Sequence, residues 1–173
     1  MTLDDSALVQ PPAHALVLNQ SSSPLLFILD TNIISETLKP RPDSNVIAWL
    51  FQNEHRLYLT AVTIGEMFTG ALRLPMGKRR ENLLLAIERI TDNFANRVFA
   101  FDCPAAQIYA RMQDATHRSG LALTVEDGMI AAICSAARAT LATHNTQDFA
   151  HLGIDLIDPF TAPAPDVVLL DKT

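Results

Sequence analysis

The chain has 173 residues, of which 49% are hydrophobic and 18% are charged. This length and composition fit one folded domain with its own apolar core and exclude a disordered or fibrous chain. The net charge of -6 argues against a protein that coats nucleic acid through a basic surface, but it does not exclude a nuclease whose carboxylates gather around metal.

The cysteines and the hydropathy pattern indicate where the protein works. Cys103 and Cys134 match no metal-ligand or disulfide pattern, so we interpret both as reduced, buried thiols. No apolar run reaches the ~18 to 20 residues that a membrane-spanning helix needs. The N-terminus carries Asp4 and Asp5 instead of the positive residues of a signal peptide. We therefore expect a cytoplasmic protein with no membrane association.

Composition divides the chain into three segments. Residues 1–24 contain several prolines and the run Ser21-Ser22-Ser23, and they show no helical or strand periodicity. We expect them to form a flexible N-terminal extension. Residues 161–173 contain further prolines and are interpreted as a C-terminal tail. Residues 25–160 alternate short apolar runs with helical patterns, which predicts a single folded domain.

The first predicted element is a short buried strand. Residues 25–29 form a continuous apolar run closed by Asp30, a pattern typical of a strand that is covered on both faces. The next element is a helix over residues 43–51, in which apolar side chains fall on one side. Asp43 or Ser44 is a suitable N-cap for this helix.

A second strand and a second helix follow. Residues 57–60 predict the strand. Thr63 is followed three residues later by Glu66, the spacing of a capping box, in which each side chain bonds the backbone of the other residue. This spacing predicts a helix that begins at Thr63, carries Glu66 in its first turn and runs toward Leu74.

The middle of the chain contains the clearest amphipathic helix. Leucine and isoleucine recur at helical spacing across residues 78–94, so one face of this helix is predicted to be buried. Residues 98–101 predict a third strand. Pro104 then suits the first turn of another helix, where its missing N–H has no intrahelical partner in any case.

The last predicted elements complete an alternating pattern. Thr124 precedes an alanine-rich helix, residues 141–143 predict a fourth strand, and residues 154–157 are a candidate fifth strand. Strands that alternate with helices along the chain indicate an α/β sandwich with a mostly parallel sheet.

Four acidic residues follow predicted strands or open the helices after them: Asp30, Glu66, Asp127 and Asp148. The carboxyl ends of parallel strands share one edge of the sheet, so these side chains are expected to converge there. Two carboxylates ~5 Å apart repel by roughly 3 kcal/mol at an effective dielectric near 20. A cluster of them therefore favours a bound cation, and hard oxygen ligands suit Mg²⁺ or Mn²⁺.

Each acidic residue also has a purely structural explanation. Asp30 can cap a turn, Glu66 can complete a capping box, and Asp127 can favour the positive end of its helix. Asp148 can hold a turn through its own backbone. Only the joint placement of all four at one predicted edge favours catalysis over these separate explanations.

Basic and imidazole side chains leave two interpretations open. Arg73 and the run Lys78-Arg79-Arg80 can contact RNA or can simply face water at a helix start. His144 can contact RNA or can act as a structural hydrogen-bonding group. Neither choice follows from the sequence pattern.

Four segments of this sequence, in order, resemble the motifs of PIN-domain toxins, in particular the FitB-like branch of the VapC family. They are residues 29–36 (LDTNIISE), 59–66 (LTAVTIGE), 125–132 (VEDGMIAA) and 142–149 (ATHNTQDF). The resemblance covers roughly residues 25–160. It implies a PIN-like three-layer α/β/α sandwich with a mostly parallel five-stranded sheet, and a ribonuclease that depends on Mg²⁺ or Mn²⁺.

The resemblance also implies roles for individual residues. Asp30, Glu66 and Asp127 form the acidic core, and Thr31 and Asn32 support it. The fourth motif varies within the family, because some relatives carry an acid at the position of Asn145. Others have asparagine there and an acid three residues later, as this chain does with Asp148. We expect Asp148 to contribute to metal binding and Asn145 to assist.

Family resemblance further implies partners and competing functions. The expected partners are a cognate antitoxin of the VapB or FitA kind, an RNA substrate and a second copy of this chain. The leading hypothesis is a toxin that hydrolyses RNA phosphodiester bonds. An alternative is a regulatory dimeric subunit of a DNA-binding toxin–antitoxin complex with an idle nuclease site. A metal-dependent DNase is a third, weaker option, because the chain lacks an obvious clamp for branched DNA.

Overall fold

The computed structural model describes residues 25–162. The predicted extension, residues 1–24, lies outside the described residues, and so does the predicted tail from residue 163 onward. Within the described range, no helix is long and apolar enough to cross a membrane. Cys103 and Cys134 are both free thiols, but only Cys134 is buried. The prediction of two buried thiols is therefore wrong for Cys103, which is exposed where the helix after Asp102 begins.

A five-stranded sheet with all neighbours parallel forms the centre of the molecule, in the order β3-β2-β1-β4-β5. This confirms the predicted mostly parallel sheet. The strands β1, β3 and β5 are shorter than the runs that predicted them, β2 matches the predicted residues 57–60, and β4 lies one residue before the predicted residues 141–143. Their bounds are β1 Phe27–Leu29, β2 Leu57–Thr60, β3 Val98–Phe99, β4 Thr140–Ala142 and β5 Leu156–Ile157.

Seven α-helices and one short 3-10 helix connect the strands of the described chain. The structure confirms Asp43 and Thr124 as N-caps, and it places Pro104 in the first turn of its helix. The helices are α1 Thr31–Thr37, α2 Ser44–Asn53, η1 Glu54–Arg56, α3 Ala61–Leu72, α4 Lys78–Asn93, α5 Cys103–Arg118, α6 Val125–Ala137 and α7 Thr146–Phe149. The sequence pattern missed α1, η1 and α7, because one or two turns are too short to show helical periodicity.

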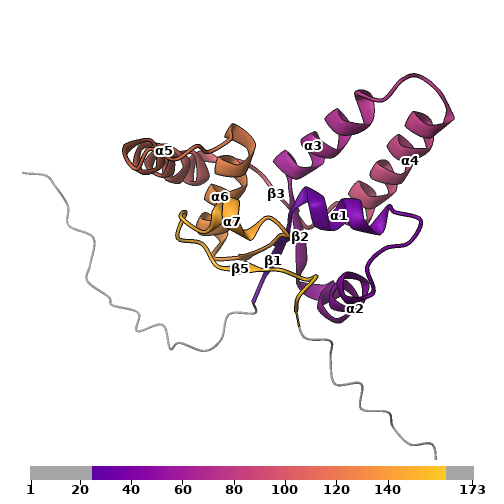
Figure 1. The fold of residues 1–173 in the computed structure, drawn as a ribbon, viewed down its shortest axis with the longest axis horizontal. Coiled ribbons are helices and arrows are strands. Elements are labelled where there is room, and N and C mark those ends of the chain that lie inside the picture. Colours follow the sequence, from indigo (N-terminus) through magenta and orange to yellow (C-terminus); the bar gives the residue numbers. More distant parts are fainter. Residues whose placement is uncertain (1–24, 163–173) are drawn as a thin grey trace, which may run out of the picture.

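The helices cover both faces of the sheet, which confirms the three-layer arrangement (Figure 1). Phe27 and Leu29 of β1 point to a core that includes residues of α1, α2, α3 and α4. Ile28, between them, points to the opposite core, which includes residues of α5, α6 and α7. Alternate side chains of a strand point to opposite faces, so β1 is buried on both sides as its apolar run predicts.

The strand order places the point of reversal between β1 and β4. From β1 the chain moves outward through β2 to β3, and then it crosses back to β4 and β5 on the other side. Ligands of open α/β sheets bind at the carboxyl ends of strands where the winding direction reverses. The residues that follow β1 and β4, Asp30 and Thr143, are thus brought to the position where a site is expected.

Candidate active site

Asp30 is the most buried acidic residue at this edge. It ends β1, serves as the N-cap of α1 and is only 7% exposed. One carboxylate oxygen accepts a hydrogen bond from the backbone N–H of Thr31 at 2.7 Å. The other accepts from Asn32 Nδ2 at 2.7 Å and from Thr143 Oγ1 at 2.6 Å. Burial raises the pKa of Asp30, the charge of Asp127 adds to the rise, and the three hydrogen bonds oppose it.

Thr143 is a site residue that the sequence pattern did not single out. It is fully buried just after β4, and its hydroxyl donates to Asp30. The same oxygen accepts from Asn32 Nδ2 at 3.0 Å and from the backbone N–H of Asn145 at 3.0 Å. A signal was present in the sequence, because Thr143 follows β4 just as Asp30 follows β1. Parallel pairing of β1 with β4 brings the two positions side by side.

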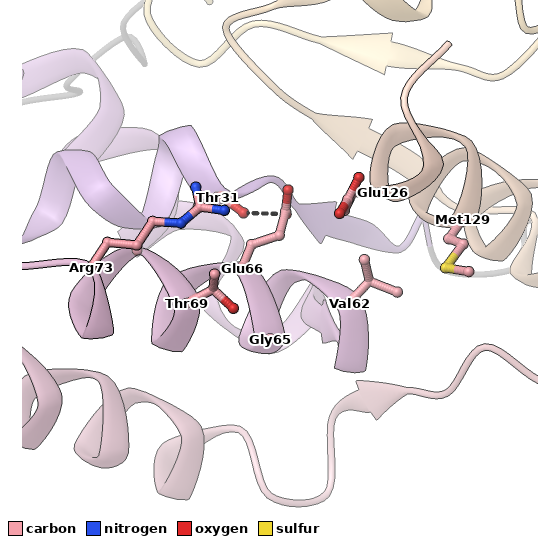
Figure 2. A pocket seen from close by; sticks show the side chains of 9 residues that line it. Thr31, Val62, Gly65, Glu66, Thr69, Arg73, Glu126 and Met129 are labelled. Carbon is pink, nitrogen blue, oxygen red and sulfur yellow. Dashed lines mark hydrogen bonds between the residues drawn. The ribbon is translucent and has the colours of Figure 1, made fainter.

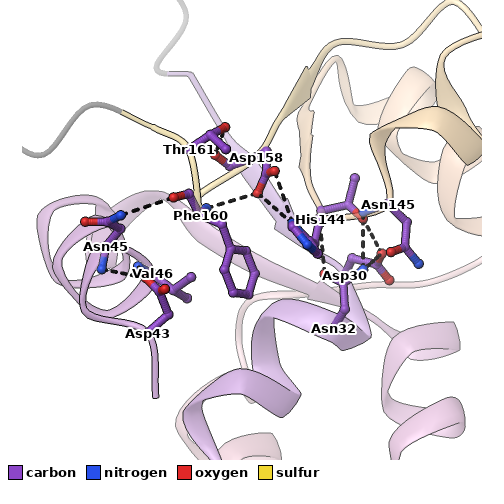
Figure 3. Close-up of polar contacts among 11 residues, drawn as sticks. Asp30, Asn32, Asp43, Asn45, Val46, His144, Asn145, Asp158, Phe160 and Thr161 are labelled. Carbon is purple, nitrogen blue, oxygen red and sulfur yellow. Dashed lines mark hydrogen bonds and ion pairs between the residues drawn. The ribbon is translucent and has the colours of Figure 1, made fainter. Parts of the chain in front are cut away.

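Asn32 links the motifs that follow β1 and β4. Its amide group donates to Asp30 and Thr143, and its carbonyl oxygen accepts from the backbone N–H of His144 at 3.1 Å (Figure 3). The expected supporting position of Asn32 beside Asp30 is thus present in the structure. The link fixes the end of β4 against the start of α1.

Glu66 reaches the site from α3, although not in the way the capping-box pattern predicts. The N-cap of α3 is Thr60 instead of Thr63, because the Thr60 hydroxyl at the end of β2 accepts the N–H of Thr63 at 2.9 Å. Glu66 therefore lies in the second turn of the helix, and the predicted first-turn position is wrong. Its carboxylate accepts a hydrogen bond from Thr31 Oγ1 at 2.7 Å, which joins α3 to α1.

The electrostatics of Glu66 show that several acidic groups meet here. Burial raises its pKa most, and the negative charges of Asp30, Asp127 and Glu126 raise it further, whereas the Thr31 hydroxyl lowers it. Glu126 lies next to Asp127 in the first turn of α6. Raised pKa values of this origin are typical of functional carboxylate clusters.

Asp127 occupies the first turn of α6, as predicted. The hydroxyl of the N-cap Thr124 accepts the N–H of Asp127 at 3.1 Å and donates to Asp127 Oδ2 at 2.6 Å. The capping hydroxyl thus fixes both the helix start and the carboxylate. The charge of Asp127 raises the pKa of Asp30 and that of Glu66, so Asp127 lies within electrostatic reach of both residues.

A cavity of about 670 Å³ lies between α3 and α6 and has Glu66 in its wall (Figure 2). Thr31 and Glu126 are at its polar side, Val62 and Met129 give it an apolar part, and Arg73 borders it from the end of α3. Arg73 is the one basic side chain among the described residues that line this cavity. The arrangement offers space for a substrate beside the acidic edge, with a cation within the same wall.

Asp148 and Asn145 lie on the side of α7. Asp148 is in the single turn of this helix and borders a second cavity of about 360 Å³ together with Asp127. Asn145 occupies the N-cap position of α7, and its backbone N–H bonds Thr143. The structure thus brings Asp30, Glu66 and Asp127 to one edge and places Asp148 next to Asp127, outside the lining of the larger cavity.

The donor set has the chemistry of a site for a hydrated divalent cation. Within residues 25–162, no three carboxylate, imidazole or thiolate groups are grouped closely enough to surround one ion. Mg²⁺ is commonly held by one or two carboxylates and keeps several waters, so a closed cage is not required. Asp30, Glu66 and Asp127 supply hard oxygen atoms and uncompensated negative charge, and these fit Mg²⁺ or Mn²⁺.

The side chain of His144 turns away from this cluster. Its Nδ1 lies 3.1 Å from a carboxylate oxygen of Asp158, and its ring packs against Phe160 with centroids 4.3 Å apart (Figure 3). Asp158 also accepts the N–H of Phe160, whose carbonyl accepts from Asn45 Nδ2. Through these contacts the segment after β5 packs against α2 and against His144. They favour a structural role for the His144 side chain.

Comparison with known proteins identifies the family. Residues 27–154, which hold four of the five strands and the acidic edge, match the model of the family described as PIN domain. The chain belongs to the PIN-domain family. This match confirms the resemblance to PIN domains that the four sequence motifs indicated. The α/β/α sandwich described above is the fold of this PIN domain.

Individual relatives of this PIN domain are similar over nearly their whole length. It is 37% identical over 137 residues to the VapC ribonuclease Y4jK of Sinorhizobium fredii, covering 78% of this chain and 98% of the relative. It is 35% identical over 137 residues to toxin FitB of Neisseria gonorrhoeae, covering 78% and 99%. A solved structure of FitAB bound to an IR36 DNA fragment matches with a TM-score of 0.73 and 35% identity, covering 80% and 98%.

Proposed function

We propose that this PIN-domain chain is the toxin of a type II toxin–antitoxin pair and acts as a divalent-metal-dependent endoribonuclease. The observation that carries the proposal is the convergence of Asp30, Glu66 and Asp127, whose charges act on one another at the carboxyl edge of the sheet. The similarity of the chain to a VapC ribonuclease and to toxin FitB supports RNA as the substrate and a toxin as the role of the protein.

In the proposed site, Asp30, Glu66 and Asp127 would hold a hydrated Mg²⁺ or Mn²⁺, one or two of them directly and the rest through its water, and Asp148 would contribute from the α7 side. When bound, such an ion lowers the pKa of coordinated water and neutralises charge that develops on the phosphate during hydrolysis. The chain's own residues orient the ligands. Asn32 and Thr143 fix Asp30, Thr31 fixes Glu66, and Thr124 fixes Asp127.

The hydrogen bonds around Asp30 limit how it can act. Its three hydrogen bonds come from donors, so they favour the charged, accepting form of the carboxylate, although burial raises its pKa more than they lower it. A carboxylate oriented by donors in this way is suited to binding a cation. Glu66 accepts one such bond, from Thr31, and borders the larger cavity, where it can also contact a water that hydrates the ion.

The proposed partners follow from the same relatives. We propose a cognate antitoxin of the VapB or FitA kind, a homodimer of this chain, and cytoplasmic RNA as the substrate. The chain resembles both toxin FitB and the structure of FitAB bound to a DNA fragment, which supports assembly with an antitoxin. The substrate RNA reaches the acidic edge through the open cavity between α3 and α6.

A second candidate function rests on that same DNA-bound structure. The chain can serve as a dimeric regulatory subunit of a DNA-binding toxin–antitoxin complex with an idle nuclease site. The retained acidic cluster argues for an active site, since mutually repelling carboxylates destabilise a fold unless a cation neutralises them. An idle subunit is expected to be indifferent to Mn²⁺.

The test uses purified, antitoxin-free protein and total RNA, with and without Mn²⁺, followed by sequencing of new 5′ ends. Asp127→Asn removes one charge with little change of volume, and Asp92→Asn on the exposed face of α4 is the matched control. We expect discrete cuts that require Mn²⁺, persist in the control and vanish in Asp127→Asn. Thermal unfolding with and without Mn²⁺ is measured on the same three proteins.

The outcomes separate the two functions. Metal-dependent cuts together with stabilisation by Mn²⁺ support the ribonuclease. Absence of cuts from a folded wild-type protein, combined with no response of its unfolding temperature to Mn²⁺, supports the regulatory subunit. Cleavage by Asp127→Asn at the wild-type rate would remove this residue from the site.

A further inference from the structure

The cavity of about 360 Å³ on the α7 side of the acidic edge shares Thr124, Asp127 and Asp148 with the proposed metal site, but its other walls have no role there. Its walls come from the segment that precedes α6, with Leu121, Ala122 and Leu123, and from the α7 region, with Gln147 and His151. Asp127 and Asp148 border it on the side of the acidic edge. The cavity therefore opens directly beside the carboxylates, and its volume lies within the ~300–1,000 Å³ that is common for small-molecule sites.

The charges in this cavity select the uncharged part of a nucleotide. Two carboxylates border it, and His151 is the one lining side chain of the described residues that can carry positive charge. Away from the carboxylates that would hold the ion, only His151 among the described lining residues can offer the positive charge that a phosphate needs, whereas in the larger cavity Arg73 offers a guanidinium. A neutral, flat group with polar edges needs no such charge in the smaller cavity.

The lining also supplies what a nucleobase needs. Leu121 is 50% exposed and, with Leu123, offers apolar surface against which a base can pack. The exposed side chain of Gln147 carries both a donor and an acceptor, the combination that can pair with the edge of a base. Proteins that recognise single-stranded RNA use such pairs of an apolar or stacking surface and a polar edge contact.

We propose that the cavity formed by residues 121–124, Gln147 and His151 is a subsite for one nucleobase of single-stranded RNA, next to the phosphodiester at the acidic edge. Gln147 reads the polar edge of this base, and Leu121 and Leu123 pack against its face. The inference rests on the proposed ribonuclease function for its substrate class. It assigns the selection of the cut position to the segment before α6 and to α7.

The test measures both binding and cleavage with the full chain free of antitoxin. Binding is followed by fluorescence anisotropy with labelled oligo(A), oligo(C) and oligo(U) RNA in Ca²⁺, and cleavage by sequencing 5′ ends from total RNA in Mn²⁺. The variants are Gln147→Ala, which removes the edge contact, and Ala122→Trp, which fills the cavity from an exposed position. Gln52→Ala, exposed on α2 outside the cavity lining, is the matched control.

We expect wild type and Gln52→Ala to prefer one base by about tenfold or more, the size of a good edge contact. In Gln147→Ala this preference falls to within about threefold, and the base bias at one position beside the cut disappears. Ala122→Trp weakens binding to all three RNAs by about tenfold. A circular dichroism spectrum and an unfolding temperature like those of wild type show that each variant is folded.

Two results overturn the subsite, and one result concerns the proposed function alone. Folded Gln147→Ala and Ala122→Trp proteins that bind and cut as wild type does would overturn it, and so would equal binding of all three RNAs by wild type. Base-selective binding that depends on Gln147, without any cleavage in Mn²⁺, would leave the subsite in place and contradict the ribonuclease.

Discussion

Thr143 Oγ1 donates a 2.6 Å hydrogen bond to Asp30 Oδ2 across a sequence separation of 113 residues. The contact is fully buried on the Thr143 side, and the same hydroxyl accepts from Asn32 and from the backbone of Asn145. One side chain therefore connects the ends of β1 and β4 and holds the most buried carboxylate of the site. The orientation of Asp30 depends on a residue that carries no charge and that no acidic motif would reveal.

Substitution Thr143→Val tests this connection, because valine keeps the volume and removes the hydroxyl. We expect the free energy of unfolding to fall by ~1–3 kcal/mol, since the buried carboxylate of Asp30, the Asn32 amide and the Asn145 backbone N–H lose a partner. Cleavage is expected to fall by roughly 10- to 100-fold, the usual effect of losing a group that orients a metal ligand. Urea unfolding and cleavage rates measure the two effects.

Two variants act as controls for that loss. Thr143→Ser keeps the hydroxyl and should retain most of the activity. Thr140→Val changes a buried threonine at the start of β4 that makes none of these contacts, so it should have a small effect on cleavage. Equal loss of cleavage in Thr143→Val and Thr140→Val would show that general packing, and not the Asp30 contact, is responsible.

The raised pKa of Glu66 sets the direction in which this residue makes stability depend on pH. The pKa of Glu66 is raised from 4.5 in the folded protein. Its contribution to the free energy of unfolding is therefore most favourable below pH 4.5 and is lost as the pH rises through the pKa of the folded state. Without metal, Glu66→Gln should therefore be more stable than wild type at pH 7 to 8, and the difference should disappear below pH ~4.5. Thermal unfolding over this pH range in EDTA measures the difference.

Glu36 should show the opposite pH dependence of stability in the same experiment, because its pKa is lowered. It pairs with Lys39 and accepts the backbone N–H of Asp43 at 2.9 Å, and these contacts lower its pKa from 4.5. Wild type should be more stable than Glu36→Gln at neutral pH, and the difference should shrink as pH falls through the lowered value. The same direction of pH dependence for Glu36→Gln and Glu66→Gln would contradict the assignment of both groups.

Gly128 lies beside Asp127 where α6 packs on α5. A Cβ added there would lie 2.7 Å from Cε2 of Tyr109, whose hydroxyl is held by Gln113. Gly128→Ala should therefore destabilise the protein by ~1–3 kcal/mol through overpacking, despite the better helix propensity of alanine. Gly70→Ala on α3 meets open space and should stabilise by up to ~1 kcal/mol. Urea unfolding compares the two, and equal signs would exclude steric contact as the cause.

His144→Ala separates a structural role of this histidine from contact with RNA. The His144 side chain is 55% exposed, and an exposed pair of this kind contributes less than about 1 kcal/mol. We expect that small loss of stability and a cleavage rate close to that of wild type, because the bond from the His144 backbone to Asn32 remains. A loss of cleavage comparable with that of Asp127→Asn would assign the imidazole to the site.

Much of the fold follows from local patterns in the sequence. The buried apolar run before Asp30 predicts β1, and its continuous hydrophobicity indicates cover on both faces. Asp43 and Thr124 identify helix starts because a capping side chain and the N–H it accepts are only two or three residues apart. The same reasoning singles out the four acidic positions: Asp30, Asp127 and Asp148 lie just after a strand or at the start of the helix that follows, whereas Glu66 lies one turn further into α3 than predicted.

Tertiary structure alone decided which of these groups meet. Thr60 instead of Thr63 caps α3, because both threonines fit the capping pattern and only the end of β2 distinguishes them. The partnership of Thr143 with Asp30 needs parallel pairing of β1 and β4, and the turn to α7 places Asp148 beside Asp127 at a separate cavity. Local sequence fixes hydrogen bonds between near neighbours, whereas contacts across the sheet depend on strand order, which no segment of the chain encodes by itself.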